Sequence, residues 1–207
     1  MRGIAKASPA SGGFFGDVMA RQLSSGPATE PVTLAEAKEH LSYDTTTTEK
    51  DNRITFLIKA ARSSCEVETN RAMITQTWIL QLERFPSTVI DIPLPPLQSI
   101  TSIQYVDSNG DTQTVDSDNY QVDTVSEPGR IAPASGCSWP STNSDYLAAV
   151  TITFVAGWTE AANVPDEIKQ AIYLFVGHWF DNLSEVNEVQ TYEMPAASKM
   201  LLTHWKA

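Results

Sequence analysis

Apolar residues recur at helical spacing in the N-terminal third of the chain. Five of them follow one another at intervals of three and four residues: Ile54, Leu57, Ile58, Ala61 and Cys65. Such intervals place side chains on one face of a helix, so the pattern predicts a helix over about residues 51–69. A shorter helix is predicted over residues 34–41, because Thr33 and Glu36 have the spacing of a capping box.

The most apolar helix is predicted over residues 165–182. Pro165 suits the first helical position, and Asp166 and Glu167 place negative charge at the positive end of the helix dipole. The apolar side chains form two stripes: Ile168, Ile172, Phe175 and Trp179 in the first, and Tyr173, Val176 and Phe180 in the second. A helix that is apolar nearly all round is buried on more than one side. We expect the first stripe to face the other helices and the second to face the sheet or another subunit.

Between these helices the apolar period changes to two, which is typical of strands. The clearest alternation runs over residues 148–157, and Asn109-Gly110 predicts a hairpin turn. Other strands are predicted over residues 74–82, 89–92, 99–106, 112–115, 120–125 and 130–131. A polar, acidic loop is then expected over 184–194, before a last short helix over 196–205.

Runs of strands flanked by runs of helices favour an α+β fold over alternating βαβ units. We therefore expect one domain over residues 31–207. It consists of two N-terminal helices within 33–70, an inserted antiparallel β-region over 73–157 and two C-terminal helices within 165–205. Residues 1–30 are rich in Ser, Gly, Ala and Pro. We expect a flexible N-terminal arm there, with ordering on a partner as the alternative.

Charge narrows the possible partners. The net charge is −11 and the isoelectric point is near 4.6. Both values argue against tight binding of nucleic acid, which needs a basic patch. They are compatible with a surface past which DNA slides, because a negative wall repels DNA. No apolar run approaches the roughly 20 residues of a membrane span, so no membrane partner is expected.

Candidate chemistry is sparse. The three histidines, His40, His178 and His204, do not have the spacing of metal ligands. The two cysteines set no disulfide framework, and no glycine-rich phosphate loop is present. The residues alone give no catalytic, cofactor or metal site, so we expect a protein that is not an enzyme. Trp139 and Trp205 lie in a polar loop and near the end of the chain, where large rings are often interface residues.

Several short motifs occur in one collinear order. They are Leu34-Ala35-Glu36-Ala37-Lys38 with Leu41, residues 54–61, residues 71–78, the proline-rich 93–100, Ser126-Glu127-Pro128-Gly129-Arg130-Ile131, Ser138-Trp139-Pro140, Val155-Ala156-Gly157-Trp158 and residues 164–179. In this order and spacing, over about residues 31–205, the chain resembles the phage gp6-like head–tail connector (adaptor) proteins.

The resemblance implies a structural adaptor of a tailed bacteriophage or phage-like particle. Such an adaptor is made in the cytoplasm of the host bacterium. It forms a dodecameric ring in the virion neck, between the portal protein and the stopper (head-completion) or tail protein. DNA passes through the lumen without specific binding during genome packaging and ejection. The resemblance also implies a helical bundle with an inserted β-region, no catalysis and no cofactor.

These expectations lead to a candidate partner interface. Its members are apolar side chains of the two C-terminal helices and one loop tryptophan: Tyr173, Val176, Phe180, Met200, Leu201, Trp205 and Trp139. We also expect that loss of residues 196–207 weakens docking to the portal and leaves the fold intact.

Two other functions stay open at this stage. A β-rich module that binds carbohydrate or a host surface could use Trp139 and Trp158 as stacking platforms. A hydrolase could use Cys137, whose neighbourhood Ser135-Gly136-Cys137-Ser138-Trp139 is faintly similar to that of a catalytic cysteine.

The first stripe of the 165–182 helix gives a stability prediction. Replacing Phe175 by Ala should leave a core cavity and lower the free energy of unfolding by about 3–5 kcal/mol. Thermal unfolding measures this loss. A midpoint within about two degrees of wild type would show that Phe175 is not a core residue.

Overall fold

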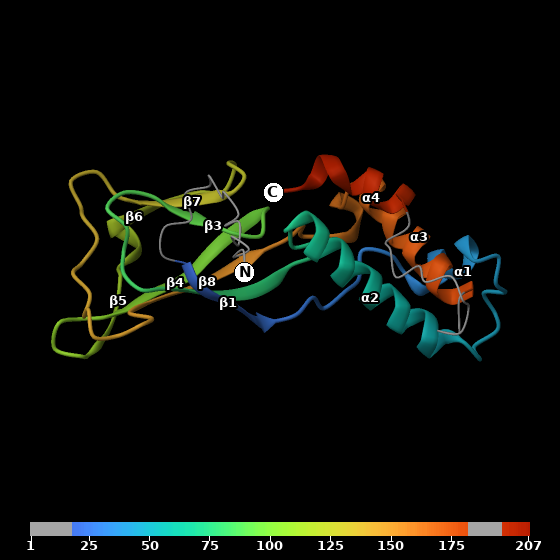
Figure 1. Ribbon diagram of the computed structural model, residues 1–207, viewed down its shortest axis with the longest axis horizontal. Coiled ribbons are helices and arrows are strands. Elements are labelled where there is room, and N and C mark those ends of the chain that lie inside the picture. The colour runs from blue at the N-terminus through green and yellow to red at the C-terminus, as the bar shows by residue number, and fades with distance from the viewer. Residues whose placement is uncertain (1–17, 182–195) are drawn as a thin grey trace, which may run out of the picture.

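Helices and strands occupy opposite ends of the protein (Figure 1). The computed structural model describes residues 18–181 and 196–207. The helices are α1 (Leu34–His40), α2 (Asp51–Thr69), α3 (Asp166–Asp181) and α4 (Ala196–Leu202). The strands are β1 (Val18–Ser25), β2 (Gln76–Leu82), β3 (Ile90–Ile92), β4 (Leu97–Val106), β5 (Thr112–Thr114), β6 (Tyr120–Asp123), β7 (Gly129–Pro133) and β8 (Val150–Ala156). The predicted α+β class is confirmed, and the predicted loop at 184–194 lies outside the described residues.

The helical half has its own hydrophobic core. The apolar stripe of α2 is buried against α3, where Ile168, Ile172 and Phe175 are at most 2% exposed. The predicted capping box of α1 is present, because Thr33 Oγ1 accepts from the Glu36 backbone N–H and the Glu36 carboxylate accepts from the Thr33 N–H. Helix α2 ends at Asn70, whose φ of 55° is left-handed.

A buried lysine fixes the loop between α1 and α2. Lys38 is 3% exposed, and its ammonium donates to the carbonyls of Thr45 and Thr47 at 3.3 and 2.7 Å. It also pairs with Asp51, the first residue of α2. Its charge is thus compensated, as burial of an ammonium requires.

The β half consists of two antiparallel sheets. One has the strand order β1-β2-β8-β4-β5 and the other has the order β3-β7-β6. Strand β8 lies at the centre of the larger sheet, and alternate residues from Val150 to Ala156 are buried. Residues of both sheets contribute to one core, including Leu80, Phe154 and Ile131. The predicted return strand after the Asn109-Gly110 turn is confirmed as β5.

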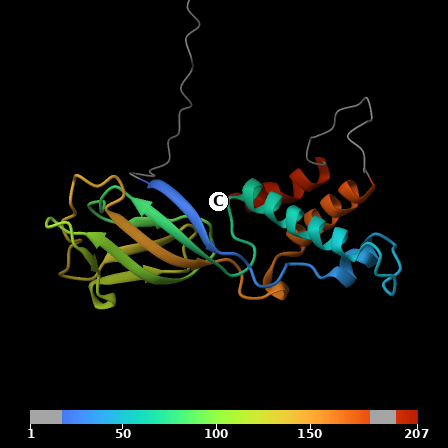
Figure 2. The same ribbon diagram turned by 90° about the horizontal axis from the view of Figure 1, so that it is seen from below.

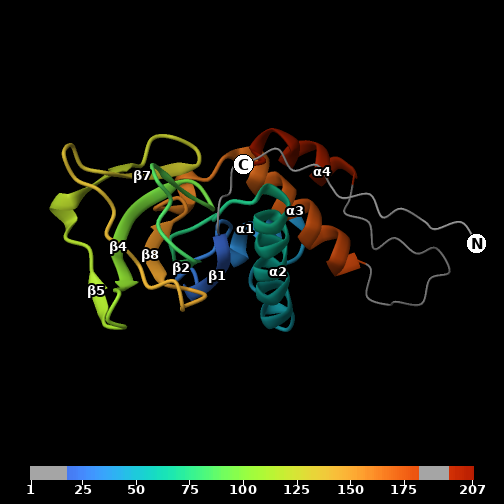
Figure 3. The same ribbon diagram turned by 60° about the vertical axis from the view of Figure 1, so that its left-hand side comes forward.

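Strand β1 corrects the expectation for the N-terminal arm. Residues 18–25 pair antiparallel with β2 at the edge of the larger sheet (Figure 3), whereas residues 1–17 lie outside the described residues. The side chains of residues 20–25 are all exposed. Backbone hydrogen bonds to β2 hold this strand. Over residues 20–25 there is no alternation of buried and exposed side chains for the sequence to reveal.

Three segments connect the two halves, and Figure 2 shows them crossing between the sheets and the helices. Two of them run side by side, since the Thr75 N–H donates to the Trp158 carbonyl at 3.0 Å. The Gly157 N–H donates to the Pro96 carbonyl at 2.8 Å. The Gln98 amide donates to the Gly157 carbonyl at 2.6 Å and to Thr75 Oγ1 at 2.8 Å. This hydrogen-bonded crossing fixes where the sheet ends and the helices begin.

Two charged side chains, one in the last turns of α2 and one just after this helix, reinforce the crossing. Glu66 pairs with Arg62 at 2.5 Å and accepts from the Met73 N–H at 3.0 Å and from the Gln76 amide. Burial raises the pKa of the Glu66 carboxyl, while these donors oppose the shift. The last turns of α2 are thereby bonded to the first residue of β2.

Buried Arg71 is the second of these side chains. It donates to the Trp205 carbonyl at 2.6 Å and pairs with Glu127 at 2.5 Å. Arg71 therefore joins the end of α2 to the C-terminal segment and to the turn between β6 and β7.

Gly157 gives a matched pair of stability predictions. Its φ is +104°, and a Cβ atom there would lie 2.3 Å from the Ile74 carbonyl oxygen. Gly136 has a φ of +81° with no atom within 4 Å of a Cβ. Gly136→Ala should cost about 1–2 kcal/mol of backbone strain, and Gly157→Ala should cost clearly more because of the clash. Denaturant unfolding compares the two variants, and equal losses would contradict the close approach at Gly157.

Candidate partner-binding surface

The second stripe of α3 lies mostly against the chain's own helical half. Val176 is fully buried in the helical core, so it has no surface left for a partner and its place in the predicted interface is corrected. Tyr173 is partly exposed and stacks on His40 of α1 with 5.1 Å between ring centroids. Burial, and then the carboxylates of Glu36, Glu39 and Asp166, raise the pKa of the Tyr173 phenol.

Phe180 is covered by the loop before α2 and by α2 itself. Its ring meets Tyr43 edge-on at 6.1 Å, and the Arg53 guanidinium lies 4.8 Å from its centroid. Arg53 also donates to the Phe180 carbonyl at 2.8 Å, which satisfies an acceptor of the last turn of α3. The sequence could not place α1 and this loop on α3, because seven residues of α1 carry too little pattern to choose a docking face.

Trp139 lies in the β half, away from the other predicted interface residues. Its ring stacks parallel on Phe85 at 4.9 Å, and its indole N–H donates to the Thr88 carbonyl at 3.0 Å. Trp158 packs against the helical core and meets Trp205 edge-on at 6.3 Å. The two tryptophans thus belong to separate cores and do not form a joint stacking platform for a sugar.

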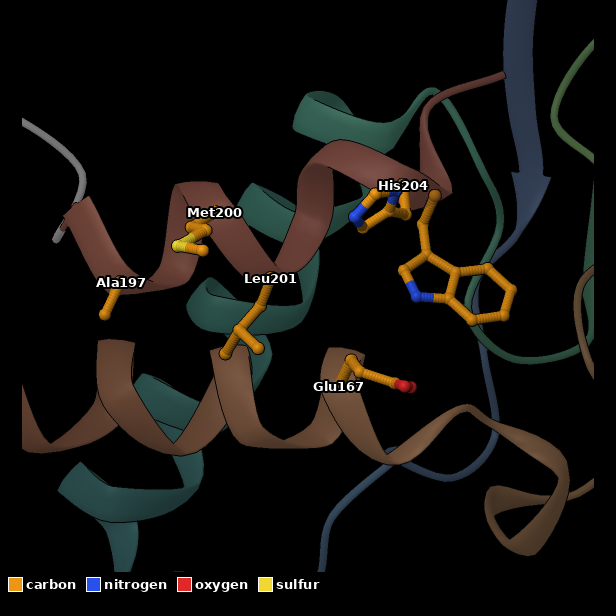
Figure 4. A pocket seen from close by; sticks show the side chains of 6 residues that line it. Glu167, Ala197, Met200, Leu201 and His204 are labelled. Carbon is orange, nitrogen blue, oxygen red and sulfur yellow. The ribbon is translucent and has the colours of Figure 1, made fainter.

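The remaining three predicted residues lie together on the last helical segment. Met200, Leu201 and Trp205 line an open groove of about 520 Å³ between α3 and α4 (Figure 4). The groove is completed by Glu167, Ala197 and His204. Met200 is 78% exposed. This mainly apolar groove is the best candidate for a partner surface among the predicted residues.

The C-terminal segment is also part of the fold. Leu202 and Ser198 are fully buried, the Ala207 N–H donates to the Thr69 carbonyl at 2.9 Å, and Lys206 pairs with Glu68 at 2.5 Å. These contacts oppose the expectation that residues 196–207 can be lost with the fold intact, because their loss removes Leu202 from the helical core. Their apolar residues indicated a docking helix, but spacing alone could not show that Leu202 docks on its own chain.

Sequence reasoning missed two apolar side chains on the outer face of α2. Phe56 is 68% exposed and Val67 is 82% exposed. Both lie off the buried stripe of that helix. Their position on the polar side of the predicted helix was the signal in the sequence that could have identified them as exposed.

Groups that could carry chemistry are dispersed. Cys137 is exposed in the β half, where its Sγ lies 3.7 Å from Asn119 Oδ1, whereas all three histidines belong to the helical half. Within residues 18–181 and 196–207, no group of three or more His, Cys, Asp or Glu side chains could hold a metal ion. In the same ranges, no helix is long and apolar enough to cross a membrane.

Comparison with known families identifies the family of this chain. The model of the family described as "Head completion protein" matches residues 31–193. The chain belongs to the head completion protein family. This family supports the broader part of the predicted resemblance, a head–tail neck or completion protein, and does not single out the gp6-like connectors. Among curated proteins, none matches this head completion protein.

Solved structures share the fold. A chain in the "Neck of empty GTA particle computed with C6 symmetry" has a TM-score of 0.75 at 20% identity, over 91% of this chain and 95% of that chain. A chain in the "Virion of native gene transfer agent (GTA) particle" has a TM-score of 0.73 at 19% identity, with the same coverages. One in the "Neck of native GTA particle computed with C12 symmetry" has a TM-score of 0.66 at 21% identity, over 89% and 94%. At these identities the likeness establishes the fold of this head completion protein.

Two neighbouring residues of α4 test the orientation of this helix. Leu202→Ala should lower the free energy of unfolding by about 2–5 kcal/mol because it opens a core cavity. Met200→Ala should change it by less than about 0.5 kcal/mol because the side chain is exposed. Chemical denaturation measures both, and similar losses in the two variants would contradict the assigned faces of α4.

Proposed function

We propose that this head completion protein is an adaptor that forms a closed ring in the neck of a tailed bacteriophage or phage-like particle. The ring stands between the portal protein and the stopper or tail protein, and DNA passes through its lumen. The broader role, a structural protein of the head–tail neck, follows from the family. The ring, its partners and the passage of DNA are the proposal.

The observation that carries the proposal is the family match over residues 31–193, together with a fold shared with chains of gene transfer agent particles. Two of those structures are necks computed with C6 and C12 symmetry. A dodecamer is compatible with both symmetries, which supports twelve copies of this chain in the ring.

The surface of the described residues supports assembly. Identical subunits form a closed ring through head-to-tail contacts, which need two different patches on each copy. The helical half exposes apolar side chains both on α2 and in the groove between α3 and α4. The two surfaces differ in position and composition, as this kind of contact requires, and an apolar groove is a typical site of interaction with a partner.

Charge supports a role beside moving DNA. From residue 85 to residue 168 the sequence has eleven acidic residues and a single basic one, Arg130. Arg130 is itself paired with Asp123 at 2.9 Å. A wall with this charge repels the phosphate backbone and so lowers the tendency of DNA to stick to it.

Mass measurement tests the proposal. The full chain is mixed with the portal protein, with the stopper protein and with both, and native mass spectrometry measures the complexes. We expect a ring-associated form containing several copies of this chain when the portal is present. A chain that stays monomeric with both partners present would overturn the proposed function.

A further inference from the structure

The outer face of α2 carries a stripe of exposed side chains. Phe56, Lys59, Ser63 and Val67 follow at intervals of three, four and four residues, which places them on one side of the helix. From Phe56 to Val67 the stripe is about 16 Å long, at roughly 1.5 Å per residue. Its two ends are apolar and its middle is polar.

The groove between α3 and α4 has matching properties. Its apolar lining includes Met200 and Leu201, and Glu167 stands at the start of α3 (Figure 4). Along the last segment, Ala197 to Trp205 spans about 12 Å at helical rise. The groove therefore offers an apolar floor that suits Phe56 and a carboxylate that suits Lys59.

The stripe and the groove lie on opposite sides of the helical half. In the view into the groove, α2 lies behind α3 and α4 (Figure 4). The buried face of α2, with Leu57 and Ile58, packs against that side, so its exposed face is turned away from the groove. Head-to-tail association requires two different patches on each copy, and patches that face in different directions allow one copy to contact two neighbours.

The charges of the two patches are complementary. Among the described residues, Lys59 and Glu167 have no ion pair within the chain. One is a cation in the middle of the stripe, and the other is an anion beside the apolar floor of the groove. Complementary charges fix the register of an interface, and like charges in the same places oppose it.

We propose that the outer face of α2 of one copy docks into the α3–α4 groove of the next copy, with Phe56 against Met200 and Leu201 and with Lys59 paired to Glu167. This inference rests on the proposed ring and names the faces that form it. A second copy is the occupant because the same chain supplies both a stripe with a cation and an apolar groove with a carboxylate, Glu167. Repetition of this contact leaves no copy with an empty groove once the ring closes.

A charge swap tests the contact in the full-length chain. Lys59→Glu and Glu167→Lys each place like charges in the interface, so each should raise the protein concentration needed for half-maximal assembly about tenfold or more. The double variant restores opposite charges and should assemble within about threefold of wild type. Mass photometry, with and without the portal protein, measures the assembled fraction.

Two further variants separate interface effects from folding. Asp166→Lys makes the same charge change beside Glu167, at a side chain that is fully exposed and outside the groove, and should assemble like wild type. Phe56→Ser should weaken assembly while leaving thermal unfolding of the monomer unchanged, because the Phe56 side chain is exposed in the monomer.

The outcomes distinguish the two proposals. This interface would be overturned if Lys59→Glu and Glu167→Lys each assembled as well as wild type, or if the double variant assembled no better than the single variants. The proposed ring would stand in either case. Equal weakening by Asp166→Lys would also overturn it, because the effect would then not depend on the groove. A wild-type chain that stays monomeric with portal and stopper would overturn the ring and, with it, this interface.

Discussion

The hydrogen-bonded crossing at Gly157 is the constraint on which the rest of the structure depends. Each half of the protein has its own hydrophobic core, so side-chain burial alone does not fix how the halves are oriented. The crossing does, because Thr75 is bonded to Trp158 and Gly157 approaches the Ile74 carbonyl too closely for any side chain. Arg71 then joins α2, the C-terminal segment and the β6–β7 turn around the same place. In the proposed ring, this rigid junction holds the sheets at a fixed angle to the helical contacts.

Much of the fold could be predicted from spacing. The helical stripe of α2, the capping box at Thr33 and the alternation along β8 are local signals, and each element forms where the pattern indicates. Strand β1 could not be predicted this way, because backbone pairing to β2 holds it while the side chains of residues 20–25 are exposed. Hydrophobic periodicity predicts an element only where its side chains are buried, and it gives no signal where the backbone alone makes the contacts.

The candidate surface shows the same limit. The excess of apolar residues on α3 was visible in the sequence, but which of them the chain itself buries was not, because α1 and the loop held by Lys38 also contribute to the helical core. Met200, Leu201 and Trp205 line one groove because all three lie on one short helical segment, and their role as a partner surface stays a prediction. Their proposed partner is the outer face of α2. The positions of Phe56 and Val67 off the buried stripe were visible in the sequence, but the direction in which this face points relative to the groove is apparent only when the helices are placed in space. The account thus assigns a structural protein two complementary faces rather than a reactive centre.

An electron cryo-microscopy map of the neck in assembled particles would test this account most directly. The account predicts a closed ring of this chain between portal and tail components, with α2 of each copy seated in the α3–α4 groove of its neighbour and Phe56 shielded from solvent. A ring in which Phe56 faces solvent in every copy, or density for this chain only outside the neck, would contradict it.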